Sequence, residues 1–200
     1  MIKTIVFDLG RVLLNFEPLE YIKNKINDES KVSAVYDAIF KSEEWLMLDR
    51  GTITEREAIN RISERNVDIA ELIELVMDNW YEILTPMEES FKILGELKEK
   101  GYKILFLSNF HMLAAEKTVT RYEFNKHFHG GVFSYVENLL KPEKEIYLKL
   151  IEQYELVPEE TIFIDDTKVN VEAANSLGIN GLIFESADKL REDLKRLMVE

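Results

Sequence analysis

Near its start the chain reads Thr4-Ile5-Val6-Phe7-Asp8-Leu9-Gly10, an apolar and β-branched run that ends in an acidic residue and a glycine. Such a run is too short for a typical helix and is typical of a strand that is buried on both faces. Four similar runs follow, at residues 103–107, 131–135, 161–164 and 181–184. We therefore predict five buried strands.

Segments with the periodicity of amphipathic helices separate the later runs. One segment ends before Gly101, one follows Pro142 and one ends before Gly178, and these residue types commonly bound helices. Alternating strands and helices predict a doubly wound α/β fold, in which a parallel sheet carries helices on both faces.

Residues 16–85 break this alternation, because they contain helical patterns and no convincing strand. Within them Thr54 and Glu57 have the spacing of a capping box, in which two reciprocal hydrogen bonds close the start of a helix. We predict that this segment is a small all-helical cap, inserted after the first strand into a core of residues 1–15 and 86–200. The alternative is an N-terminal helical half of a single domain.

The composition restricts the possible partners. The 200 residues include 38 acidic and 25 basic side chains, a formal net charge of −13, which argues against nucleic acid or an anionic membrane as a partner. The absence of cysteine excludes disulfides, thiol nucleophiles and cysteine-bound metals. No apolar run is long enough for a signal peptide or a membrane span, so we expect a cytoplasmic protein. The sequence leaves the oligomeric state open.

Polar and charged residues follow four of the predicted strands. Ligands of an open parallel sheet bind beyond the carboxyl ends of its strands, so we expect these side chains to converge. They are Asp8 after the first strand, Ser108 and Asn109 after the second, Lys141 in the loop after the third, and Asp165 and Asp166 after the fourth. A single Asp at a strand end is more often a turn or capping residue, but four such strand ends favour a site.

This set of groups suits phosphoryl transfer assisted by a metal ion. Clustered carboxylates repel one another unless a cation lies among them, and hard oxygen ligands without His or Cys favour Mg²⁺. One carboxylate stays free to attack phosphorus and form an aspartyl-phosphate. Ser108, Asn109 and Lys141 would hold phosphoryl oxygens, together with backbone amides near Leu9 and Gly10.

Four stretches, in this order, resemble the motifs of the haloacid dehalogenase (HAD) superfamily. They are Phe7-Asp8-Leu9-Gly10-Arg11-Val12-Leu13, Leu107-Ser108-Asn109, Lys141-Pro142 followed by Ile146-Tyr147, and Phe163-Ile164-Asp165-Asp166 followed by Asn170. The helical insert resembles the C1 cap of that family, including Arg50-Gly51-Thr52-Ile53-Thr54. The first motif resembles that of bacterial phosphatases of α-glucose 1-phosphate and, more distantly, that of the N-terminal phosphatase domain of epoxide hydrolases.

The resemblance, which covers nearly the whole chain, implies a Mg²⁺-dependent phosphatase acting on a small phosphate monoester through an aspartyl-phosphate. A sugar phosphate is the favoured substrate. Asp8 would be the nucleophile and a metal ligand, with the Gly10 carbonyl and the Asp166 carboxylate as further ligands. Asp165 would lie beside them and reach the metal directly or through water.

The same resemblance assigns the phosphoryl-binding groups. Ser108 and Lys141 would bind the transferring phosphoryl group, and Asn109 would shape the loop around it. Asn170 stands where the family often has an acidic residue, which puts a contribution of this position to the metal site in doubt.

Gly10 is the main departure from the family pattern. Most phosphatases of the superfamily carry a second Asp there, which acts as general acid and base, and losing such a group costs about 10²–10⁴-fold in rate. Three explanations follow. The leaving group needs little help, as with the anomeric oxygen of a sugar; another group, such as His111 or an ordered water, replaces the Asp; or the protein is a weak or inactive descendant.

Two other functions remain open at this point. A metal-independent 2-haloacid dehalogenase would share the fold and the nucleophile, but the acidic pair Asp165-Asp166 would repel a carboxylate substrate unless a cation were bound. A catalytically weak binding protein with this fold is the second alternative, and its support is Gly10.

Overall fold

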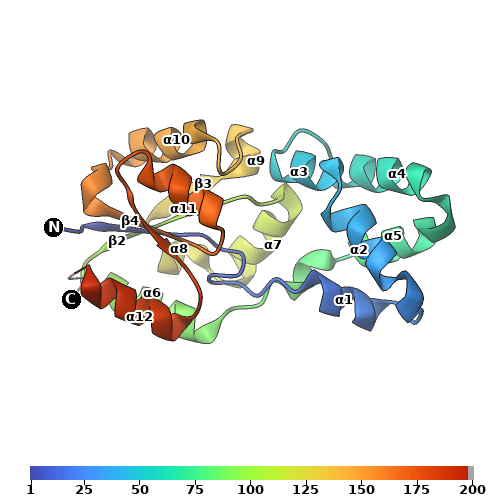
Figure 1. Ribbon diagram of the computed structural model, residues 1–200, viewed down its shortest axis with the longest axis horizontal. Helices are drawn as coiled ribbons and strands as arrows, with labels where there is room; N and C mark the ends of the chain where they lie inside the picture. The colour runs from blue at the N-terminus through green and yellow to red at the C-terminus, as the bar shows by residue number, and fades with distance from the viewer. Residues whose placement is uncertain (198–200) are drawn as a thin grey trace.

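One five-stranded parallel sheet forms the centre of the larger lobe of the protein, as the computed structural model of residues 1–197 shows (Figure 1). The strand order is β3-β2-β1-β4-β5. The strands are β1 (Thr4–Phe7), β2 (Lys103–Ser108), β3 (Gly130–Phe133), β4 (Thr161–Asp165) and β5 (Asn180–Ile183). Five parallel strands were predicted, and the structure confirms them.

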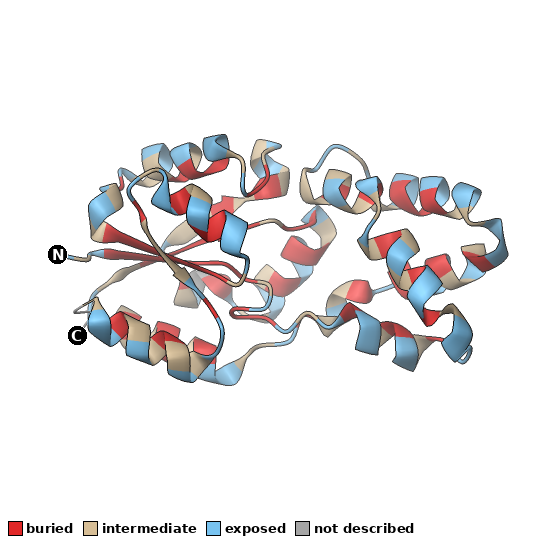
Figure 2. Ribbon diagram, in the orientation of Figure 1, coloured by how far each residue is buried: buried red, intermediate tan, exposed pale blue. Residues whose placement is uncertain are grey.

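Helices cover both faces of this sheet, which confirms the doubly wound fold. In the core lobe they are α6 (Glu88–Glu99), α7 (Met112–Arg121), α8 (Phe124–His127), α9 (Ser134–Glu137), α10 (Lys144–Tyr154), α11 (Lys168–Asn175) and α12 (Ala187–Arg196), with a 3₁₀ turn, η4 (Pro158–Glu160). Helices α10 and α11 pack on one face through Tyr147 and Ala174, and α6 and α12 pack on the other through Leu94 and Leu190. Figure 2 shows the central strands β1, β2 and β4 as almost continuously buried, whereas the edge strands β3 and β5, also predicted to be buried, are only partly so.

The position of β1 in the middle of the sheet determines where the site lies. Phe7 pairs with Phe106 of β2 on one side and with Ile164 of β4 on the other. Asp8 therefore leaves the sheet between the carboxyl ends of two neighbouring strands.

The second lobe consists of helices inserted after β1, as predicted from the sequence (Figure 1). Its helices are α1 (Pro18–Lys25), α2 (Val32–Phe40), α3 (Glu43–Asp49), α4 (Glu55–Arg65) and α5 (Ala70–Met77), with three 3₁₀ turns, η1 (Glu29–Lys31), η2 (Val67–Ile69) and η3 (Trp80–Ile83). Residues 16–85, all of them described, contain no strand. The predicted capping box at the start of α4 is present, with Thr54 and Glu57 as partners.

Two connecting segments lead the chain into the helical lobe and back, and they lie side by side. The backbone N–H of Asn15 donates to the carbonyl of Thr85 at 2.8 Å, and Leu14 forms a β-bridge with Pro86. The chain thus enters and leaves the insert at one place. Residues 198–200, which the predicted core includes, lie outside the described residues.

The structure corrects the predicted bounds of the third strand. The strand begins at Gly130 and ends at Phe133, whereas residues 131–135 were predicted. Both glycines suit close packing: a Cβ at Gly131 would lie 2.4 Å from the ring of Phe106 in β2, and one at Gly130 would lie 2.5 Å from the hydroxyl of Tyr154 in α10. Ser134 already belongs to the next helix, α9.

Within the described residues, the helices are all too short or too polar to cross a lipid bilayer.

Candidate active site

Asp8, Ser108 and Lys141 meet at the carboxyl end of the sheet, where the sequence predicted a site. The Oδ1 atom of Asp8 accepts hydrogen bonds from the Ser108 hydroxyl at 2.7 Å and from the backbone N–H of Leu9 at 2.7 Å. The Nζ atom of Lys141 lies 2.8 Å from the same oxygen. These three donors, which come from the loop after β1, the end of β2 and the loop before α10, surround a single carboxylate oxygen.

Lys141 also binds Asp165, so that one ammonium lies between two buried carboxylates. Its Nζ atom is 2.6 Å from Oδ2 of Asp165, and the side chains of both residues are almost completely buried. Burial raises the pKa of Asp8 to about 6, which Lys141 opposes and Asp165 reinforces. Burial alone would lower the pKa of Lys141, but the two carboxylates raise it, so the lysine stays charged.

Asp165 is held by further donors from its own strand end. Its Oδ1 atom accepts from the backbone N–H of Thr167 at 2.8 Å, and the side-chain amide of Asn170 donates to both carboxylate oxygens at 3.0 and 3.1 Å. An acid at position 170 would repel this carboxylate, whereas an amide stabilises it. Asn170 thus acts on Asp165, and Asp165 orients Lys141.

The acidic cluster predicted as a metal site is present. Ligand atoms of Asp8, Asp165 and Asp166 all lie within 4.8 Å of one another. Asp166 is half-buried, and burial together with the charge of Asp165 raises its pKa. Carboxylate oxygens of this spacing fit a hard cation such as Mg²⁺, which would relieve their mutual repulsion.

Asn109 joins the loop after β2 to the loop that carries Lys141. Its side-chain amide donates to the Lys141 carbonyl at 3.0 Å, and its carbonyl oxygen accepts from the Lys141 backbone N–H at 2.8 Å. This reciprocal pair holds the Lys141 backbone against the loop after β2.

His111, predicted as one replacement for the missing acid, is packed among aromatic rings. Its ring centroid lies 4.1 Å from that of Trp45 and 4.8 Å from that of Trp80, and the residue is 3% exposed. Burial lowers its pKa to about 3, so the imidazole is neutral near pH 7. Within the described residues, neither ring nitrogen makes a hydrogen bond of normal geometry.

Asp49, the last residue of α3, reaches this part of the cleft from the helical lobe, and the sequence analysis did not single it out. It lines a pocket of about 110 Å³ together with Gly10, Asn109 and His111. Its side chain is 13% exposed, and burial and the charge of Asp8 raise its pKa to about 8. The available signal was its place directly before the Arg50–Thr54 stretch that resembles a family cap.

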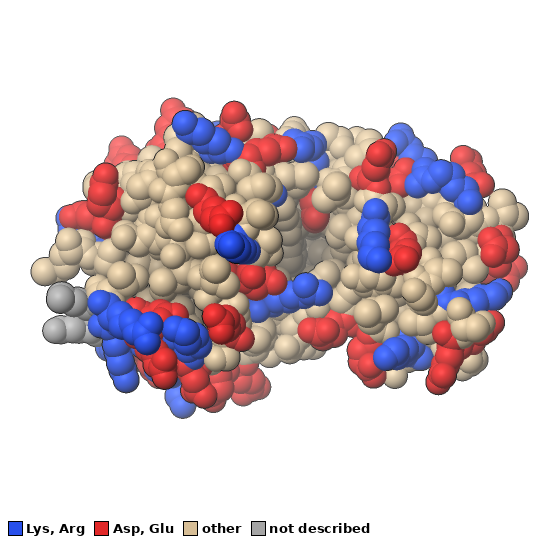
Figure 3. Space-filling view, in the orientation of Figure 1, with Lys and Arg blue, Asp and Glu red and all other residues tan. Residues whose placement is uncertain are grey.

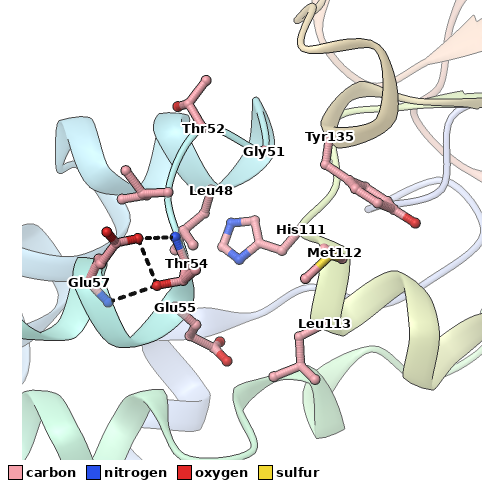
Figure 4. A pocket seen from close by; sticks show the side chains of 11 residues that line it. Leu48, Gly51, Thr52, Thr54, Glu55, Glu57, His111, Met112, Leu113 and Tyr135 are labelled. Atoms are coloured by element: carbon pink, nitrogen blue, oxygen red, sulfur yellow. Dashed lines mark hydrogen bonds between the residues drawn. The ribbon is translucent and has the colours of Figure 1, made fainter.

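A larger pocket of about 440 Å³ lies on the other side of His111, between the two lobes (Figure 4). The cap supplies Leu48 from helix α3 and Thr54 from the loop between α3 and α4, and the core supplies Met112 and Tyr135. Figure 4 shows the His111 ring directed from the core toward the cap residues, and Figure 3 shows a hollow between the lobes at the surface.

The sheet order, the helical insert after β1 and the acidic cluster define a hydrolase of the α/β class with a cap over its site. The family model of haloacid dehalogenase-like hydrolases matches residues 2–178 of the chain. The protein therefore belongs to the haloacid dehalogenase-like hydrolases.

Similar proteins of known activity include phosphatases. The chain is 28% identical to the sesquiterpene phosphatase astK of Aspergillus oryzae, over 98% of this chain and 96% of that protein. It is 26% identical to the phosphorylated carbohydrates phosphatase of Thermotoga maritima, over 88% of this chain and 82% of that protein. A solved HAD family enzyme of Bacteroides thetaiotaomicron, in complex with magnesium and inorganic phosphate, is similar with a TM-score of 0.71 at 27% identity, covering 92% of this chain and 95% of that one.

Proposed function

We propose that this hydrolase is a Mg²⁺-dependent phosphatase that transfers the phosphoryl group of a small monoester to Asp8 and then to water. The observation that carries the proposal is the convergence of the Ser108 hydroxyl and the Lys141 ammonium on one oxygen of Asp8, at 2.7 and 2.8 Å. Two donors beside a buried carboxylate are what a transferring PO₃ group requires.

We assign each side chain of the site a separate role in the reaction. Asp8 attacks phosphorus through a carboxylate oxygen, and the bond from phosphorus to the ester oxygen breaks. Ser108 and Lys141 turn from Asp8 to the equatorial phosphoryl oxygens, whose negative charge they stabilise. Asp165 and Asn109 keep Lys141 in place during both half-reactions, through contacts of 2.6 Å to its ammonium and of 2.8 and 3.0 Å to its backbone.

We place Mg²⁺ at the acidic cluster of Asp8, Asp165 and Asp166. Asp8, Asp166 and the Gly10 carbonyl would hold Mg²⁺, which supplies positive charge that offsets the repulsion between the nucleophile and the phosphate. Asp165 already accepts hydrogen bonds from Lys141, Thr167 and Asn170, so we assign it the role of positioning Lys141 and of reaching the metal through water.

The lining of the cleft favours a leaving group with an apolar face or a ring. Phe16, Trp45 and Trp80 surround the pocket beside Gly10, and aromatic walls with a few polar groups are typical of sites for small organic ligands. The phosphatase relatives act on a sesquiterpene and on phosphorylated carbohydrates, as their names state. Sugar phosphates therefore stay the first choice, and terpenyl phosphates are the second.

A substrate panel tests the proposal. Phosphate release is measured from sugar phosphates, terpenyl phosphates and p-nitrophenyl phosphate, each with Mg²⁺ and with a chelator. Release that depends on Mg²⁺ is expected for at least one class. Chloride release from chloroacetate in the presence of the chelator would instead support the dehalogenase, and no turnover of any compound would support the binding protein.

Replacement of the nucleophile is the decisive variant. Asp8→Asn keeps the shape of the side chain but removes the negative charge that attacks phosphorus, so turnover of every active ester should fall below detection. Asp37→Asn, an exposed change in α2, is the matched control and should keep full activity. Retained turnover in Asp8→Asn would rule out the aspartyl-phosphate route.

A further inference from the structure

The structure leaves open space at the position where the family usually carries its second acid. Gly10 has no atom of another residue within 4 Å of the place where a Cβ would stand. Packing therefore does not require glycine here, and no carboxylate from the β1 loop occupies the space beside the nucleophile. A phosphatase with this site still needs a proton for a basic leaving group.

A carboxyl group from the other lobe lines the pocket beside Gly10. Asp49 shares this 110 Å³ pocket with Gly10, which lies two residues after the nucleophile, and with Asn109, which follows the phosphoryl-binding Ser108. Its side chain is mostly buried, and the charges of Asp8 and Lys141 both act on its titration. In the described part of the chain, Asp49 is thus an acid of the helical lobe that shares a pocket with the reaction centre.

Residues 49–51, which we call the anchor segment, form hydrogen bonds and an ion pair with the core. The Ser134 hydroxyl donates to the Asp49 carbonyl at 2.5 Å, and Ser134 itself accepts from the backbone N–H of Phe110 at 2.9 Å. The guanidinium of Arg50 binds the carboxylate of Glu143. These contacts hold Asp49 against the loop that follows the phosphoryl-binding strand end.

The neighbourhood of Asp49 also suits proton transfer. The Nε2 atom of His111 lies 3.4 Å from Oδ1 of Asp49, and the aromatic side chains of Phe16, Trp45 and Trp80 line the pocket. Because Asp49 is buried beside the charge of Asp8, its carboxyl group retains a proton near neutral pH, as a general acid requires.

From this geometry we propose that Asp49 is the general acid and base of the reaction and takes the place of the acid missing at Gly10. This inference rests on the proposed phosphatase function. It assigns a catalytic role to a residue of the cap, outside all four sequence motifs.

The two half-reactions balance with Asp49 in this role. In the first, the Asp8 oxygen bonds to phosphorus, the ester bond breaks, and the leaving oxygen takes the proton of the Asp49 carboxyl group. In the second, Asp49, now a carboxylate, takes a proton from the water that attacks phosphorus. The bond from phosphorus to Asp8 breaks, inorganic phosphate forms, and Asp49 is protonated again.

Leaving-group basicity provides the test. Asp49→Asn is compared with the unaltered protein on benzyl phosphate, whose alkoxide must be protonated, and on p-nitrophenyl phosphate, whose phenolate departs unaided. We expect kcat/KM for benzyl phosphate to fall by about 10²–10⁴-fold, while kcat/KM for p-nitrophenyl phosphate falls less than about tenfold. Because the second half-reaction also loses its base, p-nitrophenyl phosphate should give a burst of product followed by slow turnover.

A second variant tests whether position 10 and position 49 exchange roles. Gly10→Asp added to Asp49→Asn places a carboxyl group in the open space, and it should restore benzyl phosphate turnover at least tenfold. Asp49→Ala replaces Asp49→Asn if the Asn variant does not fold, and Asp37→Asn in α2 is again the surface control.

Two kinds of outcome contradict the proposals separately. An equal loss of kcat/KM on both esters, or no loss on benzyl phosphate, would overturn the role of Asp49. Activity of Asp8→Asn would instead overturn the phosphatase proposal.

Discussion

At the scale of single residues, the buried cluster depends on one cation of the protein. Lys141 lies within 2.8 Å of Asp8 and within 2.6 Å of Asp165, and no other described Lys or Arg forms an ion pair with either carboxylate. Two carboxylates in a buried site are costly to ionise unless such a charge compensates them. The lysine to which we assign binding of the phosphoryl group therefore also stabilises the free enzyme.

Removal of this charge should destabilise the fold strongly. Lys141→Met leaves two buried carboxylates uncompensated, so the free energy of unfolding should fall by about 3–5 kcal/mol near neutral pH. Because Lys141 lowers the pKa of Asp8, the carboxylate of the variant takes up its proton at a higher pH than the pKa of about 6 in the unaltered protein, so the loss should shrink as the pH falls toward 6. Denaturant titrations at several pH values measure both effects.

Lys149→Met is the matched control for this change. Lys149 forms an ion pair with Glu137 at 3.2 Å, but its side chain is 41% exposed, so its removal should cost about 1 kcal/mol or less. A loss in Lys141→Met that is equally small, or that does not depend on pH, would contradict the compensating role of Lys141.

At the scale of elements, the anchor segment depends on a glycine that the core touches directly. Gly51 has a φ of +72°, and a Cβ there would lie 2.4 Å from the carbonyl oxygen of Tyr135 in α9. Asn138, at the end of α9, donates from its side chain to the Arg50 carbonyl at 2.9 Å. The backbone at the end of helix α3 therefore packs directly against the backbone of α9.

A side chain at position 51 should push the anchor segment away from the core. Gly51→Ala is expected to lower kcat for an alkyl phosphate at least tenfold, because Asp49 moves with the segment. Gly101→Ala is the control: its φ of +90° brings the same backbone strain of about 1–2 kcal/mol, but the space around it is open. Thermal unfolding and kcat are measured for both, and an equal effect on kcat would refute the link between this contact and catalysis.

Local sequence patterns predicted the elements and the groups at strand ends, but not the contacts between distant segments. Continuous apolar runs identify β1 and β4, and the parallel order then brings Asp8 and Asp165 together. The reciprocal hydrogen bonds between Asn109 and Lys141 follow from how two loops fold onto each other, which no local pattern encodes. Asp49 was missed for the same reason, since its place depends on how the insert docks on the core.

At the scale of the whole molecule, metal binding should appear as added stability. Burial raises the pKa of Asp8 to about 6, above its ordinary value of 3.8, so the ionised carboxylate destabilises the metal-free fold as the pH rises through that range. Mg²⁺ at about 100 times its Kd should raise the free energy of unfolding by about 2.7 kcal/mol. The increase should be larger well above pH 6 than well below it, because the ligands are then ionised.

Thermal unfolding with and without Mg²⁺ measures this effect. Asp166→Asn should reduce the stabilisation by the metal, since it removes one of the clustered carboxylates. Asp37→Asn, far from the site in α2, should leave it unchanged. Equal stabilisation of all three proteins by Mg²⁺ would place the metal elsewhere.

The paired connectors at Asn15 and Thr85 run along one edge of the cleft, and the anchor segment meets α9 at the opposite edge (Figure 1). Rotation of the insert about the connectors would carry Asp49 away from Gly10. An open enzyme would then keep its proposed nucleophile but lack its proposed proton donor. A phosphate ester too large for the closed cleft would keep the two lobes apart, but its phosphate group could still bind beside Ser108. Such a compound should bind as tightly as a good substrate but be hydrolysed slowly. Selection against large esters would therefore lower kcat and leave KM nearly unchanged.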